Sequence, residues 1–399
     1  MSVIGIVCEY NPFHRGHEYH ISKSRELAGG DAAVLCVMSG DFVQRGEAAV
    51  FSKFARAEAA CRCGADAVFE LPPPWALSSA EGFARGAVYM LAELGCDRLS
   101  FGSEAGELGP LDWIAQCILE PDFQQSVRDL LELDGSLSYA AARQRALEES
   151  LGSTAALISR PNNILAVEYL KAIYELSLSL RPMTLPRLGS GHDDESAADG
   201  CSASALRRLL AQGRDISPYV PEAALQVFRR EEQLGRTRRD KDALELAVVS
   251  RLRMLEEERF AALPDAADGA GQRLYAAVRE QPGLDAIVAA ARSKRYPVAR
   301  MRRMCMCAAL GLTAEMSRGL PSYARLLAAN ERGRALLRSL GESCRLPVIT
   351  KPASVKACGE DVQRLFATGV SAHDLFVLGY AAQEERKGGN DWRIGPKIV

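Results

Sequence analysis

Short apolar runs alternate with helical patterns over the first half of the chain. The runs at 3–10, 32–38 and 67–71 are almost unbroken, which is typical of strands buried on both faces of a parallel sheet. We expect two further strands at 98–104 and 183–188, the second at a sheet edge because it contains Pro186. Strands that alternate with helices predict an α/β fold with a doubly wound parallel sheet.

The pattern changes along the chain in two places. Residues of about 111–160 are helical throughout, which indicates an insertion into the α/β unit. Beyond residue 218 the chain is again mostly helical, with one short strand expected at 346–350. We therefore expect an α/β unit over residues 1–217 and a mainly α-helical unit over residues 218–399.

Charge divides the chain in a similar way. The formal net charge is only −2, but the two halves differ. Residues 1–200 carry 16 basic and 28 acidic side chains, whereas residues 201–399 carry 33 basic and 23 acidic side chains. An acidic half joined to a basic half favours catalysis in the first and binding of a polyanion in the second. The alternative is ordinary variation in solvated surface charge.

Other features limit the class of protein. No apolar run is long enough to span a membrane, and the N-terminus lacks a basic signal-peptide region, so we expect a cytoplasmic protein without a membrane partner. The 11 cysteines follow no disulfide or zinc spacing, so reduced buried thiols and no metal site are expected.

The candidate chemistry begins directly after the first strand. Asn11-Pro12-Phe13 ends the strand, and His14-Arg15-Gly16-His17 starts a helix. The N-terminus of a helix favours phosphate, and Gly16 allows a base or ribose to approach the backbone. His14 and His17 can donate hydrogen bonds to phosphate oxygens during displacement at phosphorus. The alternative is a pair of histidines that only cap the helix.

This segment resembles the H-x-G-H signature of the nucleotidylyltransferase superfamily. The resemblance implies a HUP or Rossmann-like domain in which an acid attacks the α-phosphate of a nucleotide. It also implies a second phosphate-binding turn, to which the segment Ser202–Arg207 is similar, although Ala203 replaces a common hydroxyl residue. There Ser202 and Ser204 can hold phosphates and Arg207 can neutralise pyrophosphate. Alone, this segment is better interpreted as a serine helix cap.

Further blocks resemble the tRNA(Met) cytidine acetate ligase family, in the family's order and over the whole chain: 5–17, 40–47, 64–72, 101–104, 160–165 and 293–296. The resemblance implies that ATP converts acetate into acetyl-adenylate with release of pyrophosphate. The N4 amine of the wobble cytidine in elongator tRNA(Met) then attacks this intermediate. ATP, acetate and this tRNA are the expected substrates, with Mg²⁺ as an open possibility.

The resemblance also implies which residues bind ATP. They are Val7, Cys8, Glu9, Tyr10, Asn11, Pro12, Phe13, His14, Arg15, Gly16, His17, His20, Gly102, Asn162 and Arg187. We expect Asp41 to act with His14 and His17 in catalysis; Asp41 and Glu104 can orient acetate, the amine or Mg²⁺, unless they are solvated loop carboxylates. Asn162 can hydrogen-bond a ribose or base edge, or merely cap a helix.

A basic segment in the second half is the expected tRNA contact. Its residues are the phosphate-binding and stacking types Lys294, Arg295, Tyr296, Arg300 and Arg303. A solvated helix face is the alternative for this segment. For the whole chain, the alternatives are a nucleotidylyltransferase that adenylylates a small phosphorylated metabolite and a non-catalytic tRNA-binding protein.

Overall fold

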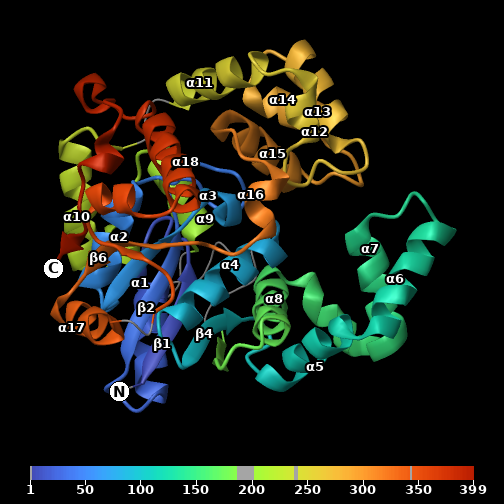
Figure 1. The fold of residues 1–399 in the computed structure, drawn as a ribbon, viewed down its shortest axis with the longest axis horizontal. Helices are drawn as coiled ribbons and strands as arrows, with labels where there is room; N and C mark the ends of the chain where they lie inside the picture. Colours follow the sequence, from blue (N-terminus) through green and yellow to red (C-terminus); the bar gives the residue numbers. More distant parts are fainter. Residues whose placement is uncertain (1, 187–201, 238–240, 342–343) are drawn as a thin grey trace.

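A computed structural model describes residues 2–186, 202–237, 241–341 and 344–399. Within these ranges an eight-stranded sheet lies at the centre, in the order β5-β4-β1-β2-β3-β6-β7, with β8 beside β6 (Figure 1). The strands are β1 Val3–Cys8, β2 Ala33–Ser39, β3 Ala67–Leu71, β4 Arg98–Ser103, β5 Arg181–Pro186, β6 Ala324–Ala329, β7 Val348–Ile349 and β8 Lys397–Ile398. The strands expected from the apolar runs and the edge position of Pro186 are confirmed.

Strands β1 to β5 are parallel to one another, as the doubly wound prediction requires. The chain adds β2 and β3 on one side of β1 and then returns to add β4 and β5 on the other. The order therefore reverses between β1 and β4. In open α/β sheets the crevice beyond the carboxyl ends at this point is where ligands bind. The residues after Cys8 and Ser103 lie at that position.

The sheet extends beyond residue 217, which the sequence pattern does not indicate. Strand β6 lies antiparallel to β3, and β7 and β8 add parallel to β6. The predicted short strand corresponds to β7, whereas β6 and β8 are unexpected. The β6 segment consists of Ala, Leu and Arg, all good helix formers, and becomes a strand because it satisfies the open edge of β3.

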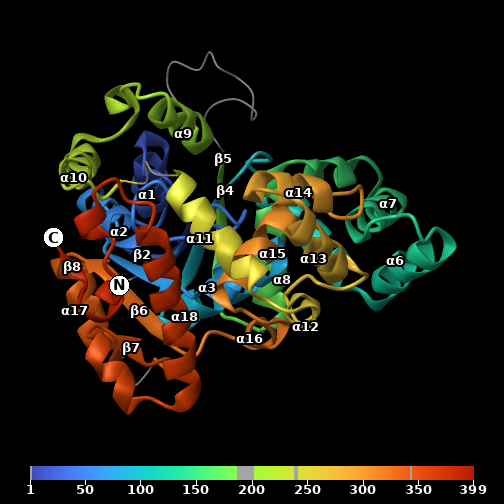
Figure 2. The same cartoon turned by 90° about the horizontal axis from the view of Figure 1, so that it is seen from above.

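Helices cover both faces of the sheet. The core on one face contains residues of α1 (Arg15–Leu27), α2 (Lys53–Arg62), α9 (Ala203–Ala211) and α10 (Glu222–Gln233). The core on the other contains residues of α3 (Pro73–Ala76), α4 (Ala80–Glu93) and α8 (Pro161–Glu175). The expected helical insertion is confirmed as α5 (Leu108–Leu119), α6 (Pro121–Leu133) and α7 (Tyr139–Leu151), which project away from the sheet (Figures 1 and 2).

The later helices form a third core. They are α11 (Lys241–Arg253), α12 (Glu257–Ala261), α13 (Ala270–Glu280), α14 (Leu284–Ala291), α15 (Val298–Leu310), α16 (Ala314–Arg318) and α18 (Glu360–Val377), whereas α17 (Glu331–Leu340) adds Leu336 to a core of the sheet. Helices α11 to α15 and the end of α18 pack around Phe42 and Ala48, which come from the loop after β2. This loop therefore joins the sheet to the helical unit.

Short 3₁₀ segments complete the described chain: Gly152–Ser159, Ser217–Tyr219, Pro352–Ala357, Gln383–Glu385 and Asn390–Trp392. No helix in the ranges given above is both long and apolar enough to cross a membrane.

Candidate functional site

The two motif histidines hold each other through the start of α1. His14 is the N-cap residue, and its Nδ1 accepts a hydrogen bond from Gly16 N at 3.1 Å. His17 Nδ1 accepts in turn from His14 N at 3.3 Å, and the ring centroids lie 3.8 Å apart. Since both Nδ1 atoms accept, each neutral ring carries its proton on Nε2, which is a donor. The cap and the donor interpretations are thus compatible.

Packing fixes this pair further. A Cβ on Gly16 would lie 2.9 Å from Cε1 of His14, so no larger residue fits without moving the ring. The buried rings of Tyr10 and Phe13 pack against His17, with centroids 4.9 and 5.6 Å away. Tyr10 adopts a left-handed backbone at φ 48°, which turns the chain out of β1. The aromatic residues of the motif therefore position it.

Arg56 stabilises the loop between β1 and α1 by hydrogen bonds to backbone carbonyl groups. This fully buried guanidinium donates to the carbonyl oxygens of Glu9 at 2.5 Å, Ser39 at 3.2 Å and Gly40. It thereby ties the carboxyl ends of β1 and β2 together. Arg56 was not among the predicted site residues, although a charge among the small apolar residues of 53–63 is a usable signal.

Polar groups of Glu9 and Asn11 also bind this loop to its surroundings. Asn11 Oδ1 accepts from Val50 N at 2.8 Å, and Glu9 Oε1 accepts from Gln44 N at 2.8 Å. Burial raises the pKa of Glu9. Asn11 Nδ2 is buried and has no hydrogen-bond partner among the residues with a described position, which leaves a donor for a ligand oxygen.

Glu104 organises the opposite side of the crevice, after β4. Its carboxylate accepts from Asn163 N at 2.9 Å and from the Nδ2 of Asn162 at 2.5 Å. The expectation that Asn162 caps the helix is wrong, because Arg160 is the N-cap residue of α8 and Glu104 supplies the capping oxygens. Glu104 therefore orients the Asn162 amide, which points to a positioning role.

Two other predicted ATP residues lie near this strand. Gly102 sits inside β4 and pairs with Leu185 of β5. His20 Nε2 lies 3.0 Å from the hydroxyl of Ser100, which joins α1 to β4. Val7 and Cys8 are half-buried at the end of β1, where they pair with β2, so their backbone lies at the same edge of the sheet.

The predicted phosphate turn meets the histidine loop. Ser202 caps α9 by accepting from Ala205 N at 3.2 Å, as its alternative interpretation required. Arg207 donates to the carbonyl of Asn11 at 3.0 Å and to Ser204 Oγ at 3.1 Å. Arg15 instead points along the surface to the carbonyl of Pro218. Arg187 lies outside the described residues.

Asp41 is a buried and hydrogen-bonded carboxylate, not a solvated one. It is 1% exposed, and its oxygens bind Lys53 N at 2.8 Å and His373 Nδ1 at 2.9 Å. Burial alone raises a carboxyl pKa, but the charges and hydrogen bonds of His373 and Lys53 outweigh it and lower the pKa of Asp41. Direct action of Asp41 on a substrate stays a prediction, while this geometry gives it a positioning role.

Asp41 belongs to a buried ionic cluster that spans the fold. Lys53 Nζ binds Glu70 and Asp391, each at 2.8 Å, and Arg325 Nη1 binds Asp391 at 2.5 Å. The carboxylates of Asp41, Glu70 and Asp391 thus face two permanent cations, and His373 Nδ1 lies against Asp41. Burial raises the pKa of Glu70 against the opposing pull of Lys53.

The loop that follows Asp41 is clamped against α15. Gly46 has φ +75°, and a Cβ there would lie 2.6 Å from the backbone nitrogen of Arg303. Glu47 forms an ion pair with Arg302 at 2.9 Å. The loop next to the histidines is therefore shaped by a helix of the second unit.

The predicted tRNA residues divide into two groups. Lys294 and Arg295 are exposed, and Arg295 pairs with Asp268 at 3.1 Å. Tyr296 is only 8% exposed, its hydroxyl donates to a backbone carbonyl, and the Arg300 guanidinium lies 5.1 Å above its ring. The expected stacking role of Tyr296 is therefore not available in this arrangement.

Arg300 and Arg303 are used inside the protein. Arg300 donates to the carbonyl of Asp265, and Arg303 pairs with the Asp265 carboxylate at 3.0 Å. Only part of the basic segment is helical, because α15 begins at Val298. The structure thus leaves Lys294 and Arg295 as the surface cations of this set.

Comparison with known proteins extends these observations. The HIGH Nucleotidyl Transferase family profile matches residues 1–391. The tRNA(Met) cytidine acetate ligase of Acetivibrio thermocellus is 34% identical over 411 residues, which cover 98% of each chain. This chain belongs to the tRNA(Met) cytidine acetate ligase family. Another member, from Syntrophotalea carbinolica, is 38% identical over 358 residues, covering 88% of this chain and 85% of its own.

Solved structures agree with this family assignment. Apo TmcAL of Thermotoga maritima superimposes with a TM-score of 0.94 at 29% identity, covering 100% of both chains. The same protein bound with alpha-thio ATP superimposes with a TM-score of 0.92 at 28% identity, again over 100% of both chains. The family resemblance and the fold class predicted from the motifs are confirmed. In the part of the chain that the structure describes, no group of three or more His, Cys, Asp or Glu side chains is arranged to hold a metal ion.

Proposed function

We propose that this chain is an ATP-dependent ligase that joins acetate to N4 of the wobble cytidine in elongator tRNA(Met). The supporting observation is the reciprocal His14–His17 pair at the start of α1, beside the point where the strand order reverses. A helix N-terminus with two Nε2 donors suits the α-phosphate of ATP. The alpha-thio ATP bound to the Thermotoga maritima structure supports ATP as the nucleotide.

In the first step a carboxylate oxygen of acetate attacks the α-phosphorus. The new P–O bond forms as the bond to the bridging β-phosphate oxygen breaks, which gives acetyl-adenylate and pyrophosphate. His14 and His17 donate to the phosphate oxygens, and Arg207 offsets charge on the departing pyrophosphate. Asn162, with its amide held by Glu104, binds the ribose or base edge.

In the second step the N4 amine of cytidine attacks the acetyl carbon. A C–N bond forms while the bond from that carbon to the adenylate oxygen breaks, which releases AMP and a proton. An unpaired base in an anticodon loop can be splayed into such a site, whereas a helical base cannot. Lys294 and Arg295 are the surface cations proposed to contact the tRNA backbone. A tRNA substrate supports a cytoplasmic location, which we propose with it.

The test is a labelling experiment with the purified protein. Incubation with ATP, labelled acetate and an elongator tRNA(Met) transcript, followed by digestion to nucleosides, should place the label in N4-acetylcytidine. AMP and pyrophosphate should form in step with it. An adenylylated metabolite formed from a cell extract, without labelled cytidine, would contradict the proposal.

A further inference from the structure

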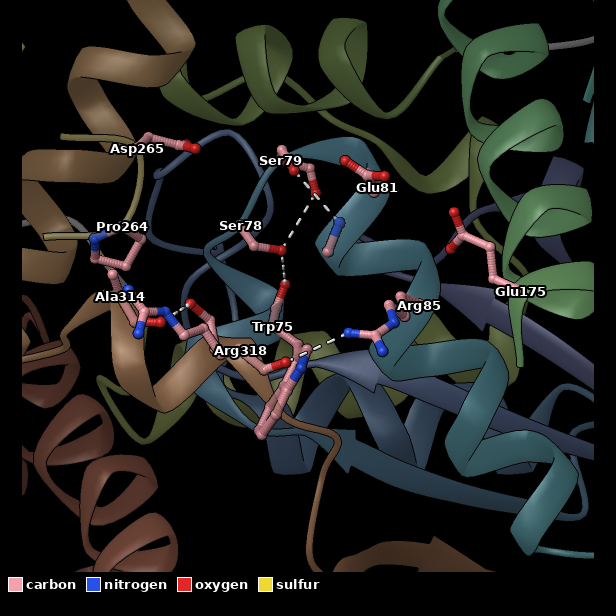
Figure 3. Close-up of a pocket in the computed structure, with 12 residues that line it drawn as sticks. Trp75, Ser78, Ser79, Glu81, Arg85, Glu175, Pro264, Asp265, Ala314 and Arg318 are labelled. Atoms are coloured by element: carbon pink, nitrogen blue, oxygen red, sulfur yellow. Dashed lines mark hydrogen bonds between the residues drawn. The ribbon is translucent and has the colours of Figure 1, made fainter. Parts of the chain in front are cut away.

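A cavity of about 550 Å³ lies between elements of the sheet unit and elements of the helical unit. Its walls include Ser79 and Arg85 of the α4 region, Glu175 at the end of α8, and Asp265 and Arg318 near α16 (Figure 3). This volume is within the roughly 300–1,000 Å³ that small-molecule sites occupy. The site already described for ATP uses none of these residues.

Some of the charged side chains that line this cavity have ion-pair partners outside it, and others do not. Glu81 pairs with Lys171 at 3.1 Å and Asp265 pairs with Arg303 at 3.0 Å, so both carboxylates have cations outside the cavity. Neither Arg85 nor Arg318 has a carboxylate partner in the described ranges. Arg85 Nη1 only donates to the backbone carbonyl of Arg318, at 3.4 Å (Figure 3).

The remaining acid does not cancel these two cations. Glu175, at the exposed end of α8, is the one carboxylate left among the described lining residues, and the charge of Arg85 acts on it, so a single acid faces two guanidinium groups. The Ser79 hydroxyl oxygen accepts from Gly82 N, so its hydrogen can be donated to a ligand. The cavity therefore offers two guanidinium groups and a hydroxyl to an anion.

The cavity is close to the ATP site along the hydrogen-bond network. The side chain of Gln44 donates to the carbonyl of Ser78 at 2.9 Å, and its backbone N–H donates to Glu9 at 2.8 Å. Ser78 lines the cavity and Glu9 belongs to the histidine loop. One residue of the loop after β2 thus touches both places. The cavity and the histidine loop are therefore neighbours across Gln44.

Building on the proposed function, we propose that the cavity receives one nucleotide of the tRNA strand next to the target cytidine. Its phosphate lies between Arg85 and Arg318, and the ribose hydroxyls contact Ser79 and Glu175. An RNA strand and a free mononucleotide both carry a ribonucleotide phosphate. The RNA strand is favoured because Gln44 links the cavity to the histidine loop, where the proposed reaction takes place.

The experiment measures tRNA affinity and acetate activation separately. Arg85→Ala, Arg318→Ala and the double variant are compared with Arg364→Ala, which removes a 70%-exposed arginine on α18. Binding of fluorescent elongator tRNA(Met) is titrated over a series of KCl concentrations. Each cavity variant should raise the Kd severalfold and reduce the slope of log Kd against log salt by about one. Arg364→Ala should change neither.

A steric variant tests the cavity without changing charge. Ala314 lines the same space from α16, and Ala314→Trp should raise the tRNA Kd while leaving the salt slope unchanged. Acetate-dependent ATP–pyrophosphate exchange and the thermal midpoint should match the wild-type values in all arginine variants. Wild-type Kd and slope in the double variant would overturn the inference.

Two further outcomes separate the possible sources of failure. If uridine monophosphate binds the wild-type protein and the double variant loses this binding but keeps its tRNA affinity, the cavity is a site for free nucleotides and the inference is overturned. If the arginine variants lose tRNA affinity but the wild type forms no N4-acetylcytidine, the cavity assignment is supported and the proposed function fails.

Discussion

Asp41 Oδ2 lies 2.9 Å from His373 Nδ1, although 332 positions separate the two residues in the sequence. The pair connects the loop after β2 to the last long helix, α18. Because Asp41 also holds the start of α2 through Lys53 N, the helical unit helps to shape the floor of the candidate ATP site. The two units are therefore coupled through buried charge.

Loss of this pair should destabilise the protein strongly. His373→Gln removes the imidazole that contacts the buried Asp41 carboxylate, and a buried charged group that loses a hydrogen-bond partner costs about 1–3 kcal/mol or more. Urea unfolding at neutral pH should show the loss. Glu360→Gln, at an exposed position on the same helix, is the control and should leave the midpoint unchanged. An equal midpoint in both variants would mean that the contact between His373 and Asp41 does not stabilise the fold.

The same pair predicts how stability depends on pH. The folded-state pKa of Asp41 is lowered, so its contribution is present above the unfolded-state pKa of about 4 and is lost as the pH falls from there toward the folded value. The free energy of unfolding should decrease between about pH 5 and pH 3, and Asp41→Asn should flatten this decrease. Unfolding curves at a series of pH values measure the slope. Equal slopes for the wild type and Asp41→Asn would show that Asp41 does not cause the pH dependence of stability.

His14→Asn separates the cap from the chemistry. Asparagine is a good N-cap residue, so the variant should lose little of the roughly 1 kcal/mol that a cap contributes. It lacks the imidazole donor, and removal of one preorganised donor costs about 100-fold or more in turnover. Acetate-dependent ATP–pyrophosphate exchange measures this loss. Near-normal exchange in His14→Asn and in His17→Ala would contradict a catalytic role for the pair.

Gly46→Ala should damage the site through the backbone of α15. A left-handed conformation costs a non-glycine residue about 1–2 kcal/mol, and the added Cβ also meets Arg303 N at 2.6 Å. Gly311→Ala is the matched control, since it has φ +71° but nothing within 4 Å of the added atom. Both variants should lose stability in urea. Only Gly46→Ala should also reduce pyrophosphate exchange, and similar activity in the two variants would exclude the clash as a cause.

The neighbouring asparagines of α8 should behave differently. Asn163 is 1% exposed and its side chain bonds Ala105 N at 3.0 Å and the carbonyl of Leu157 at 2.9 Å, so Asn163→Ala should lower the melting temperature. Asn162 is half-buried beside the crevice. Asn162→Ala should raise the KM for ATP severalfold with little change in melting temperature. If Asn162→Ala lowered the melting temperature and left the KM for ATP unchanged, Asn162 would not belong to the ATP site.

Local signals predicted what is local in this molecule. The apolar runs of β1 to β4 and the H-x-G-H segment each occupy a few adjacent residues, so period and motif suffice. The mutual hydrogen bonds of His14 and His17 also lie within one helical turn. Distant partners were not predictable in the same way. Lys53 bonds Asp391, 338 positions away, and nothing near either residue indicates the other.

Burial explains the remaining differences between the sequence predictions and the structure. Tyr296 and Arg303 have side chains typical of RNA contacts, yet the chain folds them against the 265–268 turn. Strand β6 has the composition of a helix and is a strand only because β3 leaves an edge open. In each case the tertiary environment outweighs the residue type, and a single sequence does not contain that environment explicitly.

The last residues of the chain have a consequence for its biosynthesis. Asp391 binds Lys53 at the foot of the candidate site, β8 pairs with β6, and Val399 N donates to the carbonyl of Ala329. While these residues are still inside the ribosomal exit tunnel, Lys53 faces Glu70 without its second carboxylate and the edge of β6 is open. The N-terminal nucleotide fold, although translated first, can reach its finished form only after residues 391–399 have emerged from the ribosome.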